Sequence, residues 1–191
     1  IIAAAVKESE AIANACRDIG INVSAFCDSE KRKSNDPFCN LEVIHTPTLP
    51  KRFPKARFLI ATQQIQDVVD QLSGMGYQDF HSGLELVENY DVSQHQHIIS
   101  QPYMETRLSV YKKSHEVYFD KEKTYMRSVD VMITTKCSMK CESCSNLMQY
   151  YKNPANSDYK STLEALEIIN ENVDYISEFR VIGGEPLMNK E

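Results

Sequence analysis

Three cysteines within eight residues give this sequence its clearest chemical potential. Cys137, Cys141 and Cys144 follow a C-x3-C-x2-C spacing. Thiolate sulfurs are soft ligands that suit iron-sulfur clusters and zinc, and three of them on one short loop can reach three corners of a cubane. The fourth metal corner then has no protein thiolate. The spacing therefore favours an iron-sulfur cluster with one open iron.

A structural zinc site and unligated core cysteines are the alternatives for the same cysteine motif. A zinc site would need a fourth ligand, commonly a histidine, and no histidine follows His115. The chain has six cysteines, but half of them lie in the motif and the chain is larger than the domains that need disulfide cross-links. We therefore expect a reducing compartment, the cytoplasm, and core packing for Cys16, Cys27 and Cys39.

A second motif, Gly183-Gly184-Glu185-Pro186, ends an expected strand. The cysteine motif also follows an expected strand, and the two strands are joined by a helical pattern. Both strands of a parallel βαβ unit end on the same side of the sheet, so the two motifs should be neighbours. Paired glycines allow close approach of a ligand to the backbone, and Glu185 supplies a negative charge for an ammonium group. Alone, such a segment is more often a plain turn, but its place beside the cysteines favours a binding site.

Together, the cysteine motif and the Gly-Gly-Glu segment resemble the start of the radical SAM enzyme core, over about residues 128–191. The resemblance implies a [4Fe-4S] cluster on Cys137, Cys141 and Cys144, with its open iron chelated by S-adenosylmethionine. It implies that Gly183, Gly184 and Glu185 contact the methionine amino group. It further implies that an electron cleaves the sulfonium, and that the resulting 5′-deoxyadenosyl radical abstracts hydrogen from a substrate. A small electron donor of the flavodoxin or ferredoxin type is the implied partner.

Ser143 departs from the pattern of this family. Many members have an aromatic residue immediately before the third cysteine, where it packs on the adenine. Here that position is Ser143, which we assign to the cofactor site by its place in the motif. Tyr150 or Tyr151 could replace the missing aromatic contact, and ordinary packing within the fold is the alternative for both.

The elements expected after residue 128 amount to a single βαβ unit. Apolar residues alternate over 129–133, a capping box at Ser161 and Glu164 predicts a helix start, and a second strand covers 179–182. The radical SAM barrel has several βα units, and this chain begins with Ile rather than Met. We therefore expect the N-terminal fragment of a longer radical SAM enzyme, inactive alone, with no substrate-acting residue of its own.

Residues 1–90 alternate strand-like and helix-like patterns in the order β-α-β-β-β-α, which resembles a Rossmann-like parallel sheet. The expected strands cover 1–6, 22–28, 41–44 and 57–61, and the expected helices 8–19 and 63–73, ended by Gly20 and Gly74. Asp28 ends the second strand, where a ribose-binding acid would stand. No glycine precedes Gly20, however, and Glu8 would repel a phosphate. A docking or substrate-presenting role is favoured over dinucleotide binding.

Residues 91–127 show a weaker pattern, with His95 and His97 in a polar stretch, and we expect a linker there. The net charge of −6 disfavours a broad nucleic-acid-binding surface. The apolar runs are much shorter than the roughly 20 residues that a bilayer requires, so we expect no membrane span. We also expect no secretory signal peptide.

Two other functional classes remain open. One is a zinc-stabilised interaction module, which would be colourless. The other is an iron-sulfur electron carrier without S-adenosylmethionine chemistry. The substrate itself is unknown, although the pairing of a Rossmann-like unit with a radical SAM core is similar to enzymes of bacterial surface-sugar and other secondary pathways, so a sugar-related substrate is one expectation.

Overall fold

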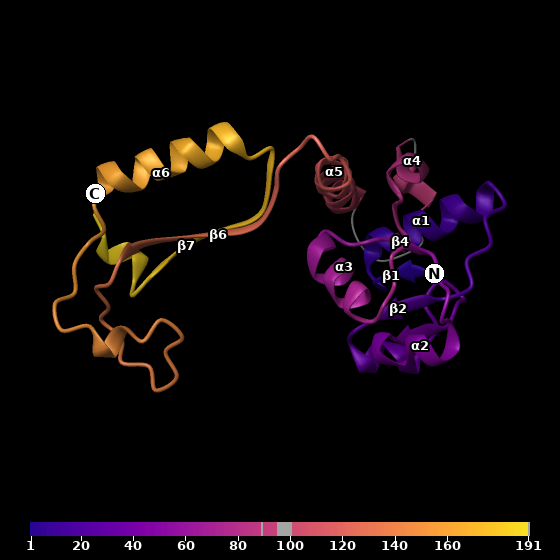
Figure 1. The fold of residues 1–191 in the computed structure, drawn as a ribbon, viewed down its shortest axis with the longest axis horizontal. Coiled ribbons are helices and arrows are strands. Elements are labelled where there is room, and N and C mark those ends of the chain that lie inside the picture. Colours follow the sequence, from indigo (N-terminus) through magenta and orange to yellow (C-terminus); the bar gives the residue numbers. More distant parts are fainter. Residues whose placement is uncertain (89, 95–100, 191) are drawn as a thin grey trace. The chain divides into compact units, whose positions relative to one another are not determined.

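The computed structural model describes residues 1–88, 90–94 and 101–190, which form two compact units (Figure 1). Unit 1 covers Ile1–Lys121 and unit 2 covers Glu122–Glu191. His95 and His97 lie outside the described residues. In the described ranges, no helix is both long enough and apolar enough to cross a membrane.

Unit 1 is built on a five-stranded sheet in the order β3-β2-β1-β4-β5, in which every neighbouring pair is parallel. Its strands are β1 (Ile2–Ala3), β2 (Phe26–Asp28), β3 (Val43–His45), β4 (Phe58–Ile60) and β5 (Phe80–Ser82). This order is consistent with the predicted Rossmann-like unit. Successive strands are added to one side of β1 up to β3 and then to its other side from β4, so the strand order reverses between β1 and β4. β5 was not predicted, because Phe80–Ser82 is too short and too polar to give a strand pattern.

Helices connect and cover these strands. They are α1 (Lys7–Asp18), α2 (Leu49–Arg52), α3 (Ile65–Gly74), α4 (Leu84–Val87) and α5 (Gln101–Tyr118), with 3-10 turns at Lys31–Asn35, Thr46–Thr48 and Val92–Gln94. Ile2, Ile12, Phe26 and Tyr111 lie fully buried in one apolar cluster that joins the sheet, α1 and α5. The core therefore draws on residues from both ends of the unit.

The two predicted helix-ending glycines behave differently. Gly20 has a φ of +76°, and the Ile21 amide donates to the Cys16 carbonyl at 2.8 Å, so the predicted left-handed cap of α1 is confirmed. At the end of α3 the prediction was wrong by two residues. Gly74 is still helical, and the left-handed residue is Gly76, with a φ of +92°.

The prediction of a linker over residues 91–127 was wrong for Gln101–Tyr118, which form the 18-residue helix α5. Met104, Leu108, Tyr111 and His115 are buried and lie three or four residues apart, so they share one face of this helix. Two of these four residues are tyrosine and histidine, and the rest of the helix exposes Tyr103 and Val110. The hydrophobic period is therefore too weak to be recognised in the sequence.

Polar side chains of α5 bind the ends of two strands. The Tyr111 hydroxyl donates to the Ile60 carbonyl at 3.0 Å and accepts from the Gly83 amide at 3.1 Å. His115 Nε2 lies 3.0 Å from the Thr62 carbonyl oxygen, and its Nδ1 lies 3.2 Å from the Ser82 hydroxyl. Burial lowers the pKa of His115 to about 4. The helix is thus an integral part of unit 1.

Unit 2 contains the predicted βαβ arrangement. β6 (Tyr125–Thr134) and β7 (Tyr175–Gly183) form a two-stranded parallel sheet, in which Val129 pairs with Phe179, and α6 (Tyr159–Asn172) connects them. Figure 1 shows the two strands running side by side. Short 3-10 turns follow at Met148–Tyr150 and Pro186–Met188. The described residues of this unit include no further strand, so the barrel stays a prediction.

The predicted capping box at the start of α6 was wrong. The helix begins three residues earlier, where the Asp158 carboxylate accepts from the Ser161 amide at 2.7 Å and from the Ser161 hydroxyl at 2.6 Å. Glu164 instead forms an ion pair with Lys160. An aspartate is a strong N-cap because it accepts from an amide in the first turn, and Ser161 supplies that amide.

The turn between β1 and α1 predicts a stabilising substitution. Ala4 has a φ of +78°, a left-handed conformation that is strained for alanine and relaxed for glycine. We expect Ala4→Gly to raise the free energy of unfolding by about 0.5–1 kcal/mol, measured by chemical denaturation. The matched control, Ala13→Gly inside α1, should lower it by about 1 kcal/mol. A destabilisation of equal size at both positions would contradict the strain.

His115 predicts that unit 1 is weakened by acid. Its folded pKa of about 4 lies below the ordinary value of 6.5, so only the unfolded chain binds a proton between these values. This contribution to stability is complete above pH 6.5 and is lost as the pH falls towards 4, by about 3 kcal/mol. The free energy of unfolding, measured with denaturant at several pH values across this range, should change less with pH in His115→Gln than in the parent chain. A pH dependence in His115→Gln equal to that of the parent chain would contradict this role of His115.

Candidate metal centre

The cysteine motif lies on the loop that follows β6. Cys141 is exposed, and Cys137 and Cys144 are half-buried. Nowhere in the part of the chain that the structure describes are three cysteine, histidine or acidic side chains gathered closely enough to hold a metal ion. The loop thus supplies three soft donors in one short stretch, which fits an iron-sulfur cluster chemically, but the sulfurs are not assembled in advance.

The Gly-Gly-Glu segment lies directly against the start of this loop. The Gly184 amide donates to the Thr134 carbonyl at 3.0 Å, and the Glu185 amide donates to the Lys136 carbonyl at 2.8 Å. These two hydrogen bonds continue the β6-β7 pairing past a register shift at the end of β6. Two motifs separated by almost the whole βαβ unit are therefore neighbours, as their positions after parallel strands predict.

The glycines are needed for this contact between backbones. A Cβ atom on Gly183 would lie 2.2 Å from the Thr134 carbonyl oxygen, and the φ of Gly183 is +149°. A Cβ atom on Gly184 would lie 2.1 Å from the Lys136 carbonyl oxygen and 2.8 Å from the Cys137 Cβ. The sequence suggested that the glycines leave space for a ligand. The structure gives them a further role, because they admit the backbone of the cysteine loop, and the contact with a ligand stays a prediction.

Cys144 sits in a tight turn, residues 144–148, which we call the Cys144 turn. The Leu147 amide donates to the Cys144 carbonyl at 3.1 Å, and Leu147 has a left-handed φ of +54°. Hydrogen bonds from the Met148 amide above all, and from the Asn146 and Leu147 amides, lower the pKa of the Cys144 thiol. The thiolate is the form that binds metal, so this turn favours ligation.

The cysteines of unit 1 have the opposite chemistry. Burial raises the pKa of Cys27 to about 12 and that of Cys39 to about 11, and it also raises the pKa of Cys16. Cys16 and Cys27 are buried, as expected for core packing, and Cys39 is half-buried. These protonated thiols are poor metal ligands.

Asparagines, which the sequence analysis did not single out, hold the loops in place. The Asn146 side-chain amide donates to the Gly183 carbonyl at 3.0 Å. Asn156 accepts from the buried Thr134 hydroxyl at 3.0 Å and donates to Asn189, whose own amide donates to the Ile133 carbonyl at 3.0 Å. The only sequence signal for Asn146 was its position two residues after Cys144.

Ser143 and the two tyrosines that could replace the missing aromatic contact are all exposed. Tyr150 and Tyr151 expose 73% and 44% of their surface. The tyrosines therefore do not pack in the core, and a contact of either with a cofactor stays a prediction. Glu185 is half-buried beside the loop that carries the cysteines.

At the carboxyl edge of the unit 1 sheet, the polar groups that a dinucleotide would need are bound by the chain itself. In dinucleotide-binding domains, amides of the first βα turn bind the pyrophosphate. Here the Ala5 amide donates to Asp28 Oδ2 at 3.0 Å, and the Val6 amide donates to the Ser9 hydroxyl at 3.0 Å. Asp28 also binds Lys33 Nζ at 2.8 Å, so its carboxylate is engaged within the protein.

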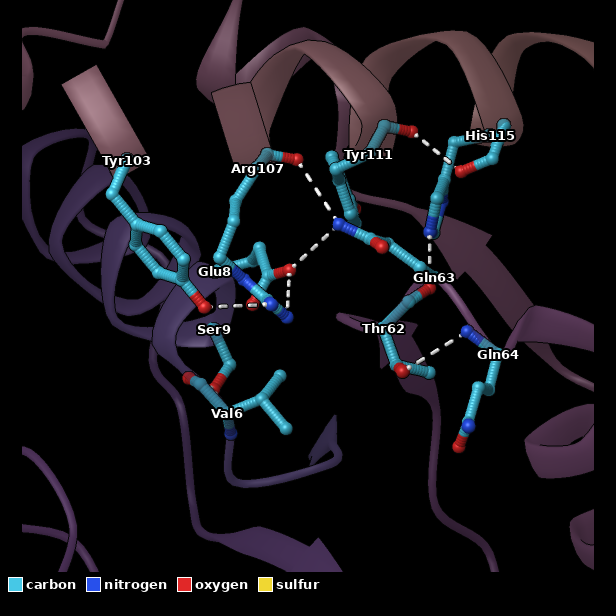
Figure 2. A network of polar contacts seen from close by, with 11 residues as sticks. Val6, Glu8, Ser9, Thr62, Gln63, Gln64, Tyr103, Arg107, Tyr111 and His115 are labelled. Carbon is cyan, nitrogen blue, oxygen red and sulfur yellow. Dashed lines mark hydrogen bonds and ion pairs between the residues drawn. The ribbon is translucent and has the colours of Figure 1, made fainter. Parts of the chain in front are cut away.

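The start of α1 is closed in the same way (Figure 2). Glu8 is fully buried, and its Oε1 lies 2.6 Å from Arg107 Nη2 and 3.1 Å from Gln63 Nε2. Arg107, which comes from α5, also donates to the Tyr103 hydroxyl at 3.1 Å. A buried carboxylate in the first turn of α1, engaged by side chains of the protein, would repel a phosphate at this helix N-terminus.

The comparisons agree with an iron-sulfur site in unit 2. A family model described as a 4Fe-4S single cluster domain matches residues 126–191. No curated protein and no solved structure matches the chain. The matched residues include the cysteine motif, α6 and the Gly-Gly-Glu segment. They indicate a 4Fe-4S cluster-binding domain, without being specific for radical SAM enzymes.

The close backbone contact predicts that Gly184→Ala disrupts unit 2. Its Cβ would collide with the Lys136 carbonyl oxygen, so the Glu185 hydrogen bond must break, at a cost of about 1–3 kcal/mol. Hydrogen exchange should become faster at the Gly-Gly-Glu segment. Gly74→Ala is the matched control, because a Cβ there meets nothing within 4 Å. Equal exchange in both variants would show that the contact is unimportant.

Proposed function

We propose that unit 2 binds a [4Fe-4S] cluster and S-adenosylmethionine as the opening part of a radical SAM enzyme core. The observation that carries this proposal is the pair of hydrogen bonds that brings the Gly-Gly-Glu segment against the cysteine loop. A cluster with one open iron beside a segment that contacts a methionine amino group is the arrangement that this chemistry requires. The match to a 4Fe-4S single cluster domain supports the cluster itself.

Each predicted residue has a distinct role in this proposal. Cys137, Cys141 and Cys144 would hold three irons. Gly183, Gly184 and Glu185 would contact the methionine amino group, and Ser143 would lie at the cofactor site. When bound and reduced, the cluster would supply the electron that cleaves the sulfonium to methionine and a 5′-deoxyadenosyl radical.

The remaining parts of the proposal concern the whole enzyme. Reduction of the cluster requires a low-potential partner, and we propose a small flavodoxin or ferredoxin. The radical would abstract hydrogen from a substrate that this chain does not identify. Unit 1 would act in docking or in substrate presentation, since its own side chains bind the amides that a dinucleotide would need.

Anaerobic reconstitution tests the cluster. The 191-residue chain with added ferrous iron and sulfide should become brown and bind about four irons and about four sulfides. Cys137→Ser, Cys141→Ser and Cys144→Ser should each lose most of this iron. Cys39→Ser should retain it, because that thiol lies outside the motif and its pKa is raised. A colourless chain that takes up zinc instead would favour the interaction module.

Addition of S-adenosylmethionine then distinguishes a radical SAM enzyme from an iron-sulfur electron carrier. Chelation of the open iron should change the electron paramagnetic resonance (EPR) spectrum of the reduced cluster. 5′-Methylthioadenosine should not cause this change, because it lacks the amino and carboxylate groups that chelate the iron. A cluster that forms and is reduced but whose spectrum ignores the added ligand would favour an electron carrier.

A further inference from the structure

Asn146 forms the side-chain link between the Cys144 turn and the Gly-Gly-Glu segment among the contacts of the described residues. Its amide donates to the Gly183 carbonyl at 3.0 Å. The other hydrogen bonds between the cysteine loop and this segment, from Gly184 and Glu185, join backbone to backbone. The Asn146 contact can therefore be removed by substitution without altering the main chain.

This amide fixes the orientation of one particular peptide group. The carbonyl of Gly183 and the amide of Gly184 belong to the same peptide plane. Asn146 binds the carbonyl at 3.0 Å, and the Thr134 carbonyl binds the amide at 3.0 Å. Gly183 has no side chain to restrict its rotation, so without these two bonds the peptide would be free to turn. Glu185 follows directly, and its position depends on this plane.

The cysteine loop needs such a tether because the cluster cannot provide it. The three thiols are not gathered for metal binding in the described chain, so bonds to iron would arrange them relative to one another. Those bonds do not set the position of the Cys144 turn relative to β7. A buried carbonyl such as that of Gly183 also needs a donor, and Asn146 supplies it.

We propose that Asn146 is a positioning residue that sets the place of the Cys144 turn relative to the Gly183-Gly184 peptide. This inference rests on the proposed function, because the distance that it controls is the one that S-adenosylmethionine would span, from the cluster to the Gly-Gly-Glu segment. Loss of the amide weakens binding of S-adenosylmethionine and leaves cluster assembly intact.

Two substitutions remove the tether in different ways. Asn146→Ala deletes the amide, and Asn146→Asp keeps the shape but has no hydrogen to donate to the carbonyl. Asn146→Gln keeps the donor on a longer side chain and should recover part of the effect. Asn172→Ala is the matched control, because Asn172 also donates to a main-chain carbonyl, that of Ile168 at 2.7 Å, but within α6.

The test uses the reconstituted 191-residue chain and three readouts. Iron and sulfide content should stay at the parent level in every variant. EPR titration of the reduced cluster should give a dissociation constant for S-adenosylmethionine about tenfold higher for Asn146→Ala and Asn146→Asp, and unchanged for Asn172→Ala. In the cluster-free chain, the Gly184 amide should exchange faster in the two Asn146 variants only.

Three results would overturn the inference. Parent-like affinity in Asn146→Ala would show that the tether does not position the ligand. Loss of iron from this variant would assign Asn146 to cluster assembly instead. A parent chain whose cluster never responds to S-adenosylmethionine would remove the proposed function and this inference with it, a failure distinguished from the first two because it occurs without any substitution.

Discussion

The candidate metal centre depends on the close approach of two backbone segments. The Gly184 and Glu185 amides reach the Thr134 and Lys136 carbonyls only because neither Gly183 nor Gly184 carries a Cβ atom. This contact joins the end of β7 to the start of the cysteine loop. It converts two motifs at opposite ends of a βαβ unit into one local arrangement. Any side chain at these positions would push the loop away. The fold of unit 2 therefore requires glycine at both positions.

The two units differ in the polar groups that lie at the carboxyl ends of their parallel strands. In unit 1 the polar groups at this edge are engaged within the protein: Asp28 accepts from the Ala5 amide, and Glu8 forms an ion pair with Arg107. Burial of an unpaired carboxylate such as that of Glu8 costs several kcal/mol of desolvation free energy, and Arg107 of α5 supplies the opposite charge. In unit 2 the cysteine donors are exposed or half-buried, and the amides of the Cys144 turn favour a thiolate. The same parallel-strand geometry thus carries engaged polar groups in unit 1 and accessible thiols in unit 2.

Several features were predictable because they depend on local sequence. Hydrophobic patterns recognisable in the sequence alone predicted the strands β1 to β4, the helices α1 and α3, and the βαβ unit. Helix α5 has no such pattern, because its buried face includes Tyr111 and His115, whose polar atoms are bound by groups distant in the chain, among them the Ile60 and Thr62 carbonyls. The start of α6 was misplaced because a serine and an aspartate are both good caps, and the chain uses Asp158. The site residues were chosen by motif, and the asparagine that links them was not.

The sequence by itself determined the donors and their order: three soft sulfurs on one loop, a glycine pair after the next parallel strand, and a first βα turn without glycine. Parallel strands must end on one side, so the neighbourhood of the two motifs also followed from sequence. Only the tertiary structure decided that the glycines face the loop backbone, that Asn146 holds the Gly183 carbonyl, and that Arg107 neutralises Glu8. These contacts join residues between 37 and 99 positions apart in the chain, counted from 146 to 183 and from 8 to 107, and no local pattern records such a pairing.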